Sequence, residues 1–378
     1  MYRPVPEILL KVLKKCNATN YEGYDPYDAL NSPLTDLINF GKPGRIFFTH
    51  LVKESPINFR NALGIEKERN PMAIALFSLV YYNLYKYANK KDYKRKSEKL
   101  AKWLIGNRNE NKHIYWGYNF PWQSGRSFLP KYGPCSVVSY FAGEAIRRIK
   151  PDRYEEILEK LSGFYLNHLN RLVETDEYLC LSYTPFEESK IVNSNALIAH
   201  QLAEFAKILS KTEYQNQAKK IINWVISKQD TDGGWFYSPD SHLGKDNFHN
   251  GYVLWALMRY WEITQNQKVL DSIKKGLKFY RSLFEDDGMP IFSNEKKYPI
   301  DIHNCSQGII TFKETERLNL HKEGFYDNIL DWTIENMWDD DKHYFYYQKH
   351  RLWTNKIPYM RWSQAWMAYA LSGLLLND

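Results

Sequence analysis

The sequence has few cysteines and no long hydrophobic run. Its four cysteines are scattered without C-x-x-C spacing, which argues against a zinc site and against a disulfide framework (Cys16, Cys135, Cys180 and Cys305). No segment approaches the length of apolar chain that spans a membrane, and the N-terminus has no long apolar stretch with a cleavage signature. We therefore expect a reduced, cytoplasmic protein without a membrane-inserted segment.

Several catalytic signatures are also missing. Glycine-rich phosphate loops, Ser–His–Asp signatures and paired redox cysteines are absent, which excludes nucleotide, acyl-transfer and thiol chemistry. The H-E-x-x-H and H-x-x-E spacings are absent too, so we expect neither a metal nor a cofactor. The formal charge of +7 is spread over lysine-rich helix faces, with no basic run interleaved with aromatic residues. Nucleic acid is thus an unlikely partner, and the mild positive balance favours an acidic sugar.

Aromatic residues, by contrast, are abundant. The chain holds 12 Trp, 29 Tyr and 19 Phe, or 16% of its residues. Aromatic rings with polar tips suit clefts that are half apolar and half wet, including clefts that bind sugars. Thick packing between helices is the alternative for most of these residues, and the hydrophobic fraction of 44% allows a sizeable core.

One stretch, residues 229–261, shows the pattern on which the chain is organised. A helix ends, a glycine turn and a short aromatic run follow, and polar residues open the next helix. The pattern recurs about every 55 residues, which indicates stacked two-helix units. We align its equivalent points at Ser139, Asn195, His249, His303 and roughly Trp362; His249-Asn250 and His303-Asn304 match directly.

The periodicity predicts an all-α fold. The expected helices cover residues 71–87, 93–105, 135–149, 154–169, 193–209, 215–227, 250–260, 269–284, 301–312, 326–337 and 361–375. Stacked units can form an open solenoid or a closed ring. Alternate helices are richer in apolar and small residues, whereas the others carry Lys and Glu, which favours an (α/α)6 toroid. We expect one domain over residues 1–378, with residues 1–62 partly irregular and the sixth unit supplied by residues 70–107 and the N-terminal segment. Short strands should lie at the rim (116–118, 180–185, 233–238, 289–293 and 344–348).

In a ring, the polar residues at the starts of the inner helices converge on one cavity. Helix N-termini carry partial positive charge, so this cavity suits a carboxylate or phosphate. His249 and His303 each follow an aspartate, Asp246 and Asp301 respectively. An adjacent aspartate can fix the tautomer of a histidine and raise its pKa, which makes a general acid or base. Alternatively, both aspartates are helix caps and both histidines only fill helix starts.

Further residues complete the candidate site. Tyr183 is a possible acid or base if a neighbouring cation lowers its pKa, and Arg361 or Arg126 could bind a carboxylate with two hydrogen bonds. The catalytic candidates are His249, His303, Asp246, Asp301, Tyr183 and Arg361. Rim packing and helix capping are the alternatives for the substrate-binding candidates, which are Trp116, Tyr118, Asn119, Trp122, Gln123, Asn195, Trp235, Tyr237, Gln307, Tyr346 and Trp362.

Six motifs together carry a family resemblance: YDPYDALNSP, WGYNFPWQ, SYTP, DGGWFY, DNFHNGYVL and DIHNCSQGI. The chain resembles the (α/α)6-toroid proteins encoded with surface-polysaccharide and archaeal N-glycan assembly genes, which are labelled glycosyl-hydrolase-like. The resemblance covers most of the chain. DGGW also marks prenyltransferase and terpene-cyclase toroids, but their DxDD motif is absent from a matching context. The resemblance implies processing of a hexuronate or glycan without fixing the reaction.

Three functions remain open from the sequence. The first is a C5 epimerase or lyase acting on a glycan that contains uronic acid, because abstraction of a proton beside a carboxylate needs a base and a cation. The second is a glycoside hydrolase, which needs two carboxylates; Asp246, Asp301, Asp232 and Glu144 are the candidates. The third is a non-catalytic glycan-binding protein of a polysaccharide assembly system.

Overall fold

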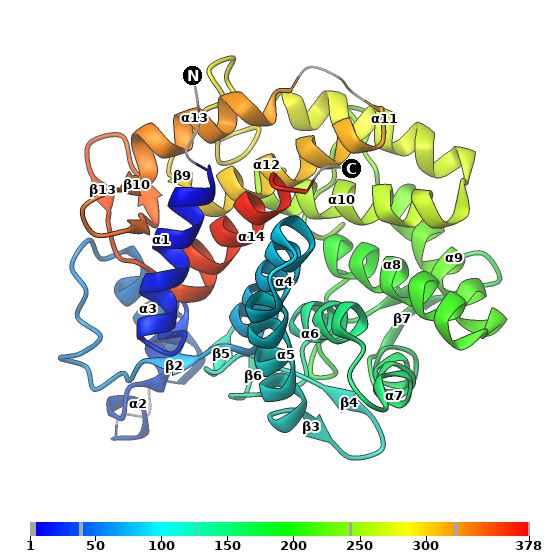
Figure 1. Ribbon diagram of the computed structural model, residues 1–378. Coiled ribbons are helices and arrows are strands. Elements are labelled where there is room, and N and C mark those ends of the chain that lie inside the picture. The colour runs from blue at the N-terminus through cyan, green and yellow to red at the C-terminus, as the bar shows by residue number, and fades with distance from the viewer. Residues whose placement is uncertain (1–4, 38–40, 126, 242–243, 321–323, 377–378) are drawn as a thin grey trace.

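The computed structural model describes residues 5–37, 41–125, 127–241, 244–320 and 324–376, which form six pairs of helices (Figure 1). Five pairs are consecutive in sequence, and the inner helix comes first in each. They are α4 (Pro71–Ala88) with α5 (Lys91–Gly106), α6 (Ser136–Ile149) with α7 (Tyr154–Asn167), α8 (Val192–Leu209) with α9 (Thr212–Ser227), α10 (Asn247–Thr264) with α11 (Gln267–Arg281), and α12 (Ile302–Arg317) with α13 (Tyr326–Met337). In the sixth pair, α14 (Trp366–Gly373) packs against α1 (Val5–Ala18) from the other end of the chain.

The inner helices form a closed ring. Each of α4, α6, α8, α10 and α12 contacts the next inner helix in sequence, and α14 contacts α4. Helices α7, α9, α11 and α13 lie on the outside in Figure 1, while α14 lies near the centre. The fold is therefore an (α/α)6 toroid, as predicted. Because α1 and α14 together make one pair, the first and the last of these helices are neighbours in the ring.

Burial separates the inner from the outer helices. In α8, 14 of 18 residues are buried, whereas six of 16 are buried in its outer partner α9. Small residues let the inner helices approach closely: a Cβ atom on Gly251 of α10 would lie 2.4 Å from Cγ of Gln307 on α12. Glycine at this position brings together the two helices that carry the predicted histidines.

A repeated contact fixes the start of four inner helices, or of the turn that opens them, to the loop before. The Asn195 side chain accepts from Leu181 N at 2.8 Å and donates to Leu181 O at 2.9 Å. Asn250 makes the same pair of bonds to Trp235, at 2.8 and 2.9 Å. Gln364 does so with Phe345, and Ser139 with Trp116. Asn195 thus corresponds to Asn250, so our alignment of Asn195 with His249 was wrong by one residue.

The loops at the rim carry short antiparallel strands. These pair as β1 (Glu22–Gly23) with β2 (Glu68–Arg69), β3 (Asn109–Glu110) with β4 (Ile114–Tyr115), β5 (Trp122–Gln123) with β6 (Phe128–Leu129), β7 (Arg171–Glu174) with β8 (Leu179–Leu181), β10 (Trp338–Asp339) with β11 (Tyr344–Phe345), and β12 (Gln348–Lys349) with both β9 (Ile300–Asp301) and β13 (Thr354–Asn355). No strand forms at three of the expected ranges, 116–118, 233–238 and 289–293; in the last of these, Pro290 and Ser293 make isolated bridges to Phe284 and Asp246.

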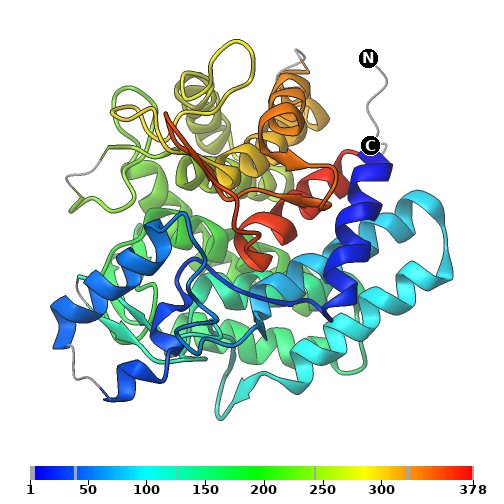
Figure 2. The same ribbon diagram turned by 90° about the vertical axis from the view of Figure 1, so that its left-hand side faces the viewer.

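The N-terminal segment contributes more helix than its sequence pattern indicated. Besides α1 it contains the turn η1 (Asp28–Asn31), α2 (Leu34–Leu37) and α3 (Gly41–Glu54). Helix α3 lies outside the ring and is the blue helix on the left of Figure 2. The final inner helix also differs from the expected 361–375, because Met360–Ala365 forms a π-helical turn before α14 begins.

Two features of the composition have structural counterparts. All four cysteines are buried free thiols, and burial raises the pKa of Cys16, Cys180 and Cys305 to about 12. Thiols that stay protonated are poor nucleophiles.

Among the described helices, none is long and apolar enough to cross a membrane.

Candidate active site

A cavity of about 470 Å³ lies at the starts of the inner helices, and we call it the histidine pocket. Every inner helix or its opening turn contributes to the lining: Met72 of α4, Val137 of α6, Asn193 of α8, Phe248, His249 and Tyr252 of α10, His303 of α12, and Arg361 and Trp362 of the π-helical turn. The predicted convergence therefore occurs. Nine of the predicted site residues reach this pocket: His249, His303, Tyr183, Arg361, Tyr118, Trp122, Gln123, Tyr237 and Trp362.

His249 is held by Asp246 as a dyad. One oxygen of Asp246 accepts from the backbone N–H of His249 at 2.9 Å and caps α10, and the other lies 2.7 Å from Nδ1 of the ring. The His249 side chain is 23% exposed and packs between the rings of Tyr237 and Phe248. Because the carboxylate holds the Nδ1 proton, Nε2 is the nitrogen that can take up a proton.

His303 is held differently. It is buried among Phe248, Trp362 and Trp366, and its Nε2 lies 3.2 Å from the Tyr252 hydroxyl. Burial, and then the charge of Arg361, hold the pKa of His303 well below its usual range, so the ring is neutral at pH 7. A neutral imidazole donates a hydrogen bond from one ring nitrogen and accepts one at the other, so the tautomer decides which of these Nε2 does toward Tyr252.

Asp301 caps α12 but does not contact the His303 ring. One of its oxygens accepts from the backbone N–H of His303 at 2.8 Å and from Nε1 of Trp362, also at 2.8 Å. The other accepts from Nε2 of Gln348 at 2.6 Å. The predicted Asp301–His303 dyad is therefore wrong, and Asp301 instead orients the indole of Trp362.

Two tyrosines face each other in the pocket. The hydroxyls of Tyr118 and Tyr183 lie 3.0 Å apart. Burial raises the pKa of each phenol above its ordinary value. The condition for Tyr183 as an acid or base, a pKa lowered by a neighbouring cation, is thus not met, and each hydroxyl can donate and accept hydrogen bonds.

Arg361 is already paired. Its Nε and Nη2 atoms donate to the two carboxylate oxygens of Asp25 at 2.6 and 2.8 Å, and both side chains are buried. The Nε/Nη2 edge of the guanidinium, which would bind a substrate carboxylate with two hydrogen bonds, is therefore occupied by Asp25. Arg361 lines the pocket beside Tyr118 and Trp362 but is not available as the expected clamp for a substrate carboxylate.

The charges around the pocket are unbalanced. Among the described residues that line the pocket are Lys53, Arg361 and three histidines, and none of these lining residues is an aspartate or a glutamate. Asp246 and Asp301 are not among the lining residues; Asp246 is bonded to His249, and Asp301 to Trp362 and Gln348. Nowhere in the described ranges do three or more metal-ligating side chains gather at one point.

The remaining predicted residues hold the frame of the ring. The indoles of Trp116 and Trp235 donate to the carbonyls of Leu104 and Val225 at the ends of outer helices, at 2.9 and 3.0 Å. The other amides and phenol bond within the protein: Asn119 to Asn70, Asn195 to Leu181, Gln307 to Thr311 and Tyr346 to Asp339.

Three further candidates have other outcomes. Asp232 pairs with Lys245 at 2.6 Å, away from the histidine pocket. Glu144 lies at the opposite end of α6 and pairs with Arg147 at 2.7 Å. Neither can therefore serve as a hydrolase carboxylate in this pocket. Arg126 lies outside the described residues.

One wall of the pocket was not predicted. Ile46, His50 and Lys53 of α3 line it, together with Tyr27. Their spacing of four and three residues places them on one helical face, a signal that the sequence does contain. The segment lies outside the repeat, and so the repeat gave no reason to assign this face to the site. Tyr252 also lines the pocket and is not among the predicted residues.

Comparisons with known proteins agree with this architecture. No family model and no curated protein matches the sequence. Among solved structures, cellobiose 2-epimerase from Bacillus thermoamylovorans has a TM-score of 0.64 at 11% identity, covering 81% of this chain and 87% of that one. D-mannose isomerase has a TM-score of 0.61 at 12% identity, covering 81% and 86%. An unsaturated glucuronyl hydrolase specific for heparin has a TM-score of 0.60 at 11% identity, covering 98% and 95%. The chain shares their fold.

Proposed function

We propose that the protein is a sugar-active enzyme that transfers a proton at a carbon next to a carbonyl or carboxyl group. The observation that carries this proposal is the histidine pocket itself: two histidines from equivalent repeat positions line a cavity whose described lining holds no carboxylate. Histidine is the commonest general acid or base at neutral pH. The similarity in fold to a sugar epimerase and a sugar isomerase supports the same chemistry.

Each histidine has a distinct role in this proposal. His249 is the base, because Asp246 holds its Nδ1 proton and stabilises the imidazolium that forms. The neutral His303 ring and the Tyr252 hydroxyl beside it form the second proton-transfer group: the Tyr252 hydroxyl proton goes to the carbanion, solvent replaces it, and His249 releases to solvent the proton it took from carbon. Epimerisation needs both groups, whereas elimination of a leaving group after abstraction needs the base alone.

An acidic sugar is the first candidate substrate, with reaction at C5 of a uronate. Its carboxylate would lie at Lys53 and at the helix N-termini, because Arg361 is engaged by Asp25. Lys53 lies over the ring of Tyr27 at 5.1 Å and 3.3 Å from the Glu54 carboxylate. These contacts hold its pKa above the ordinary value despite burial, so it is charged at pH 7.

A neutral aldose with reaction at C2 is the second candidate. The Arg361–Asp25 pair favours it, since the buried cation of the pocket is already neutralised. A hydrolase mechanism receives less support, because its two flanking carboxylates have no counterpart in the described lining. A purely binding role would leave the Asp246–His249 dyad without a purpose.

Incubation with uronate oligosaccharides and with reducing aldoses in D2O tests the proposal. We expect deuterium to enter at C5 of a uronate or at C2 of an aldose, as followed by NMR, and His249→Ala to abolish the exchange. His168→Ala, at the end of α7, is the control and should retain it. New reducing ends without deuterium incorporation would identify a hydrolase. Full exchange by His249→Ala would refute the assigned base.

A further inference from the structure

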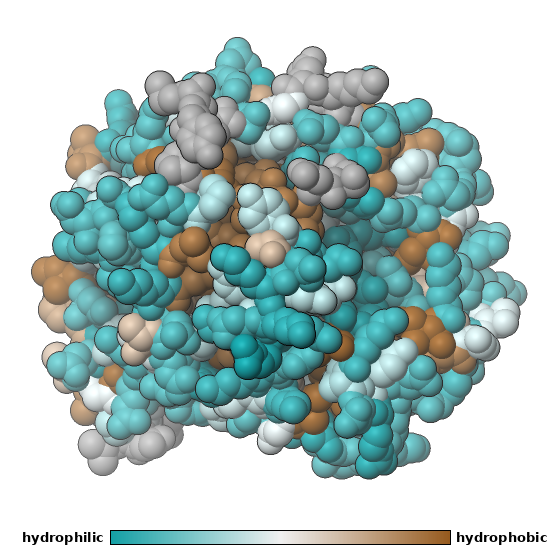
Figure 3. All heavy atoms as spheres, viewed as in Figure 1, coloured by the Kyte–Doolittle hydropathy of each residue, from teal (hydrophilic) through white to brown (hydrophobic). Residues whose placement is uncertain are grey.

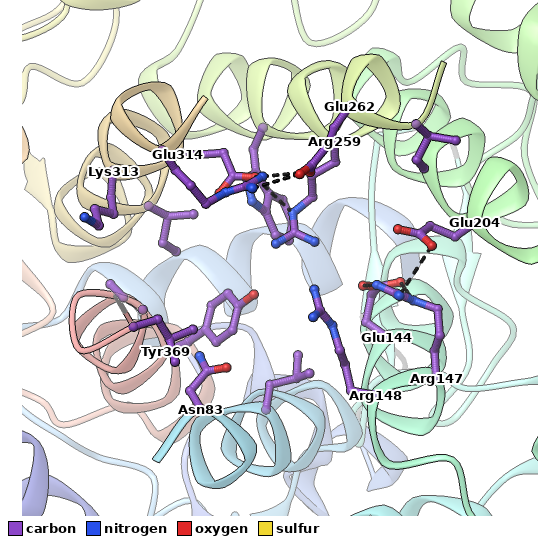
Figure 4. A pocket seen from close by; sticks show the side chains of 18 of the residues that line it. Asn83, Glu144, Arg147, Arg148, Glu204, Arg259, Glu262, Lys313, Glu314 and Tyr369 are labelled. Atoms are coloured by element: carbon purple, nitrogen blue, oxygen red, sulfur yellow. Dashed lines mark hydrogen bonds and ion pairs between the residues drawn. The ribbon is translucent and has the colours of Figure 1, made fainter. Parts of the chain in front are cut away.

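A second cavity, of about 480 Å³, lies at the opposite ends of the same inner helices (Figure 4). We call it the arginine pocket. It is lined by Arg147 and Arg148 of α6, Arg259 of α10 and Arg317 of α12, and by Trp255 and Tyr369. On α10, Phe248 of the histidine pocket and Trp255 of the arginine pocket are seven residues apart, or about 10 Å along the helix axis. In Figure 3 this face shows a hollow beside its centre, bordered by hydrophilic residues.

Positive charge exceeds negative charge in this lining. Six arginines and lysines face four glutamates. Two of the arginines are fully matched: Arg147 pairs with Glu144 at 2.7 Å and Glu204 at 3.4 Å, and Arg317 pairs with Glu262 at 2.7 Å and Glu314 at 2.9 Å. In Figure 4, Glu144, Arg147 and Glu204 lie on the right of the pocket, and Glu262 and Glu314 lie at its top.

Arg148 and Arg259 are not matched in this way. Arg148 has no ion pair or hydrogen bond within the described part of the chain, and the sole carboxylate recorded near Arg259 is that of Glu314, at 3.7 Å. The Nε atom of Arg259 is buried without a hydrogen-bond partner among the described residues. In Figure 4 both guanidinium groups point toward the middle of the pocket and toward each other, as does the hydroxyl of Tyr369.

This arrangement is unfavourable in an empty pocket. Burial, and then repulsion by the charges of Arg259 and Arg147, lower the pKa of Arg148, whereas Glu314 offsets this at Arg259, whose pKa is raised. Compensation of helix dipoles explains the presence of basic residues at helix C-termini, and Arg147, Arg148 and Arg317 lie in last turns. It does not explain why the guanidinium groups of Arg148 and Arg259 converge on the middle of the pocket. A bound anion would relieve the repulsion.

We propose that the arginine pocket binds a phosphate group, either as inorganic phosphate or as the phosphate of a monoester. The positive excess of the lining matches a dianion, and planar guanidinium groups bind phosphate oxygens with paired hydrogen bonds. Tyr369 supplies a further donor, and Trp255 supplies an apolar wall under Arg259, whose guanidinium lies 4.9 Å from the indole. The pocket volume also leaves room for the organic part of a small monoester.

Calorimetric titration of the full chain with inorganic phosphate, at constant ionic strength, tests this site. We expect saturable binding that Arg148→Gln weakens at least about tenfold, because a charge-assisted hydrogen-bond donor is lost. Arg148→Lys keeps the charge but loses the planar fork, so its affinity should lie between the two. The control is Arg153→Gln, which removes an equal charge from a side chain that is 80% exposed on the outer surface. This variant should bind phosphate like the parent protein.

Unfolding temperature gives a second readout. Without phosphate, Arg148→Gln should unfold at the same temperature as the parent protein or at a higher one, because the Arg148 side chain has no protein partner to lose. Added phosphate should then raise the unfolding temperature of the parent protein more than that of the variant. A parallel titration with a hexose phosphate distinguishes the two sources: tighter binding than phosphate identifies a monoester, and equal binding identifies the free ion. No saturable binding of either, or equal responses of Arg148→Gln and Arg153→Gln, would overturn the proposal.

Discussion

At the scale of single residues, Asp246 and Asp301 precede the two histidines of the pocket but do different things. Both cap an inner helix, yet only Asp246 also reaches the ring of the following histidine, at 2.7 Å. The difference follows from the spacing, since Asp246 lies three residues before its histidine and Asp301 lies two. Three residues span nearly one helical turn and place both side chains on one face.

Asp246→Asn tests the dyad. An amide at this position cannot stabilise the imidazolium, so we expect the turnover number of the proton-exchange reaction to fall at least about 100-fold. The measurement is the rate of deuterium incorporation as a function of pH. Asp301→Asn should leave the shape of the pH profile unchanged, because Asp301 does not contact a titrating ring. Equal profiles for the parent and Asp246→Asn would contradict the role of Asp246.

The buried state of His303 predicts a pH dependence of stability. Its pKa is lowered in the folded protein, so below the ordinary value of about 6.5 the unfolded chain binds more protons than the folded one. The stability contributed by the neutral ring is therefore complete above that pH and is lost as pH falls. Burial lowers the pKa of His200 in the same direction.

We expect the free energy of unfolding, measured with urea, to decrease between pH 7 and pH 5. One histidine accounts for at most about 1.4 kcal/mol per pH unit. His303→Gln should make the decrease shallower, whatever its effect on stability at pH 7. The interpretation fails if the pH dependence of the variant parallels that of the parent.

At the scale of elements, the clamps at the inner-helix starts are the contacts that join each helix to its rim loop. Asn250 makes three hydrogen bonds of 2.8–2.9 Å, to Trp235 and to Asp246 O. Asn304, at the equivalent position of the next unit, makes one of 3.3 Å to Ile291 O, and its Oδ1 atom has no partner among the described residues. The two amides thus form a natural comparison.

Asn250→Ala should lower the free energy of unfolding by about 1–3 kcal/mol or more, because it leaves the buried N–H and C=O groups of Trp235 without partners. Asn304→Ala should have a smaller effect. Both values can be measured by urea unfolding at pH 7. Equal losses for the two variants would show that the clamp geometry is not what stabilises these helix starts.

Much of the fold could be predicted at this scale, and less of the site. Helices such as 326–337 agree with the structure because apolar periodicity reflects burial on one face. His249 and His303 could be aligned from the His-Asn pairs, since Asn250 and Asn304 both donate to a carbonyl of the loop before their helix. The Arg361–Asp25 pair could not be found, because no local pattern relates residues 336 positions apart.

At the scale of the whole molecule, α1 closes the ring. Its buried face packs against α14 and the rest of the core, and it includes Leu9, which is fully buried. Leu10 beside it is 46% exposed. Leu9→Ala should therefore lower the free energy of unfolding by about 2–5 kcal/mol, whereas Leu10→Ala should change it by less than about 0.5 kcal/mol.

Urea unfolding followed by fluorescence and by circular dichroism checks this pair. Because α1 and α14 form one unit of a closed ring, we expect both signals of Leu9→Ala to shift together in a single transition. Separate transitions for the two signals would mean that α1 detaches while the other five pairs stay folded.

This closure also bears on how the protein is made. Ala18 and Trp366 are 348 positions apart, so a ribosome finishes α1 long before it begins α14. At translation rates of about 5–20 residues per second, the apolar face of α1 remains unpaired for tens of seconds before α14 has been synthesised. We expect the nascent chain to stack its five consecutive hairpins first and to join its two ends only after release.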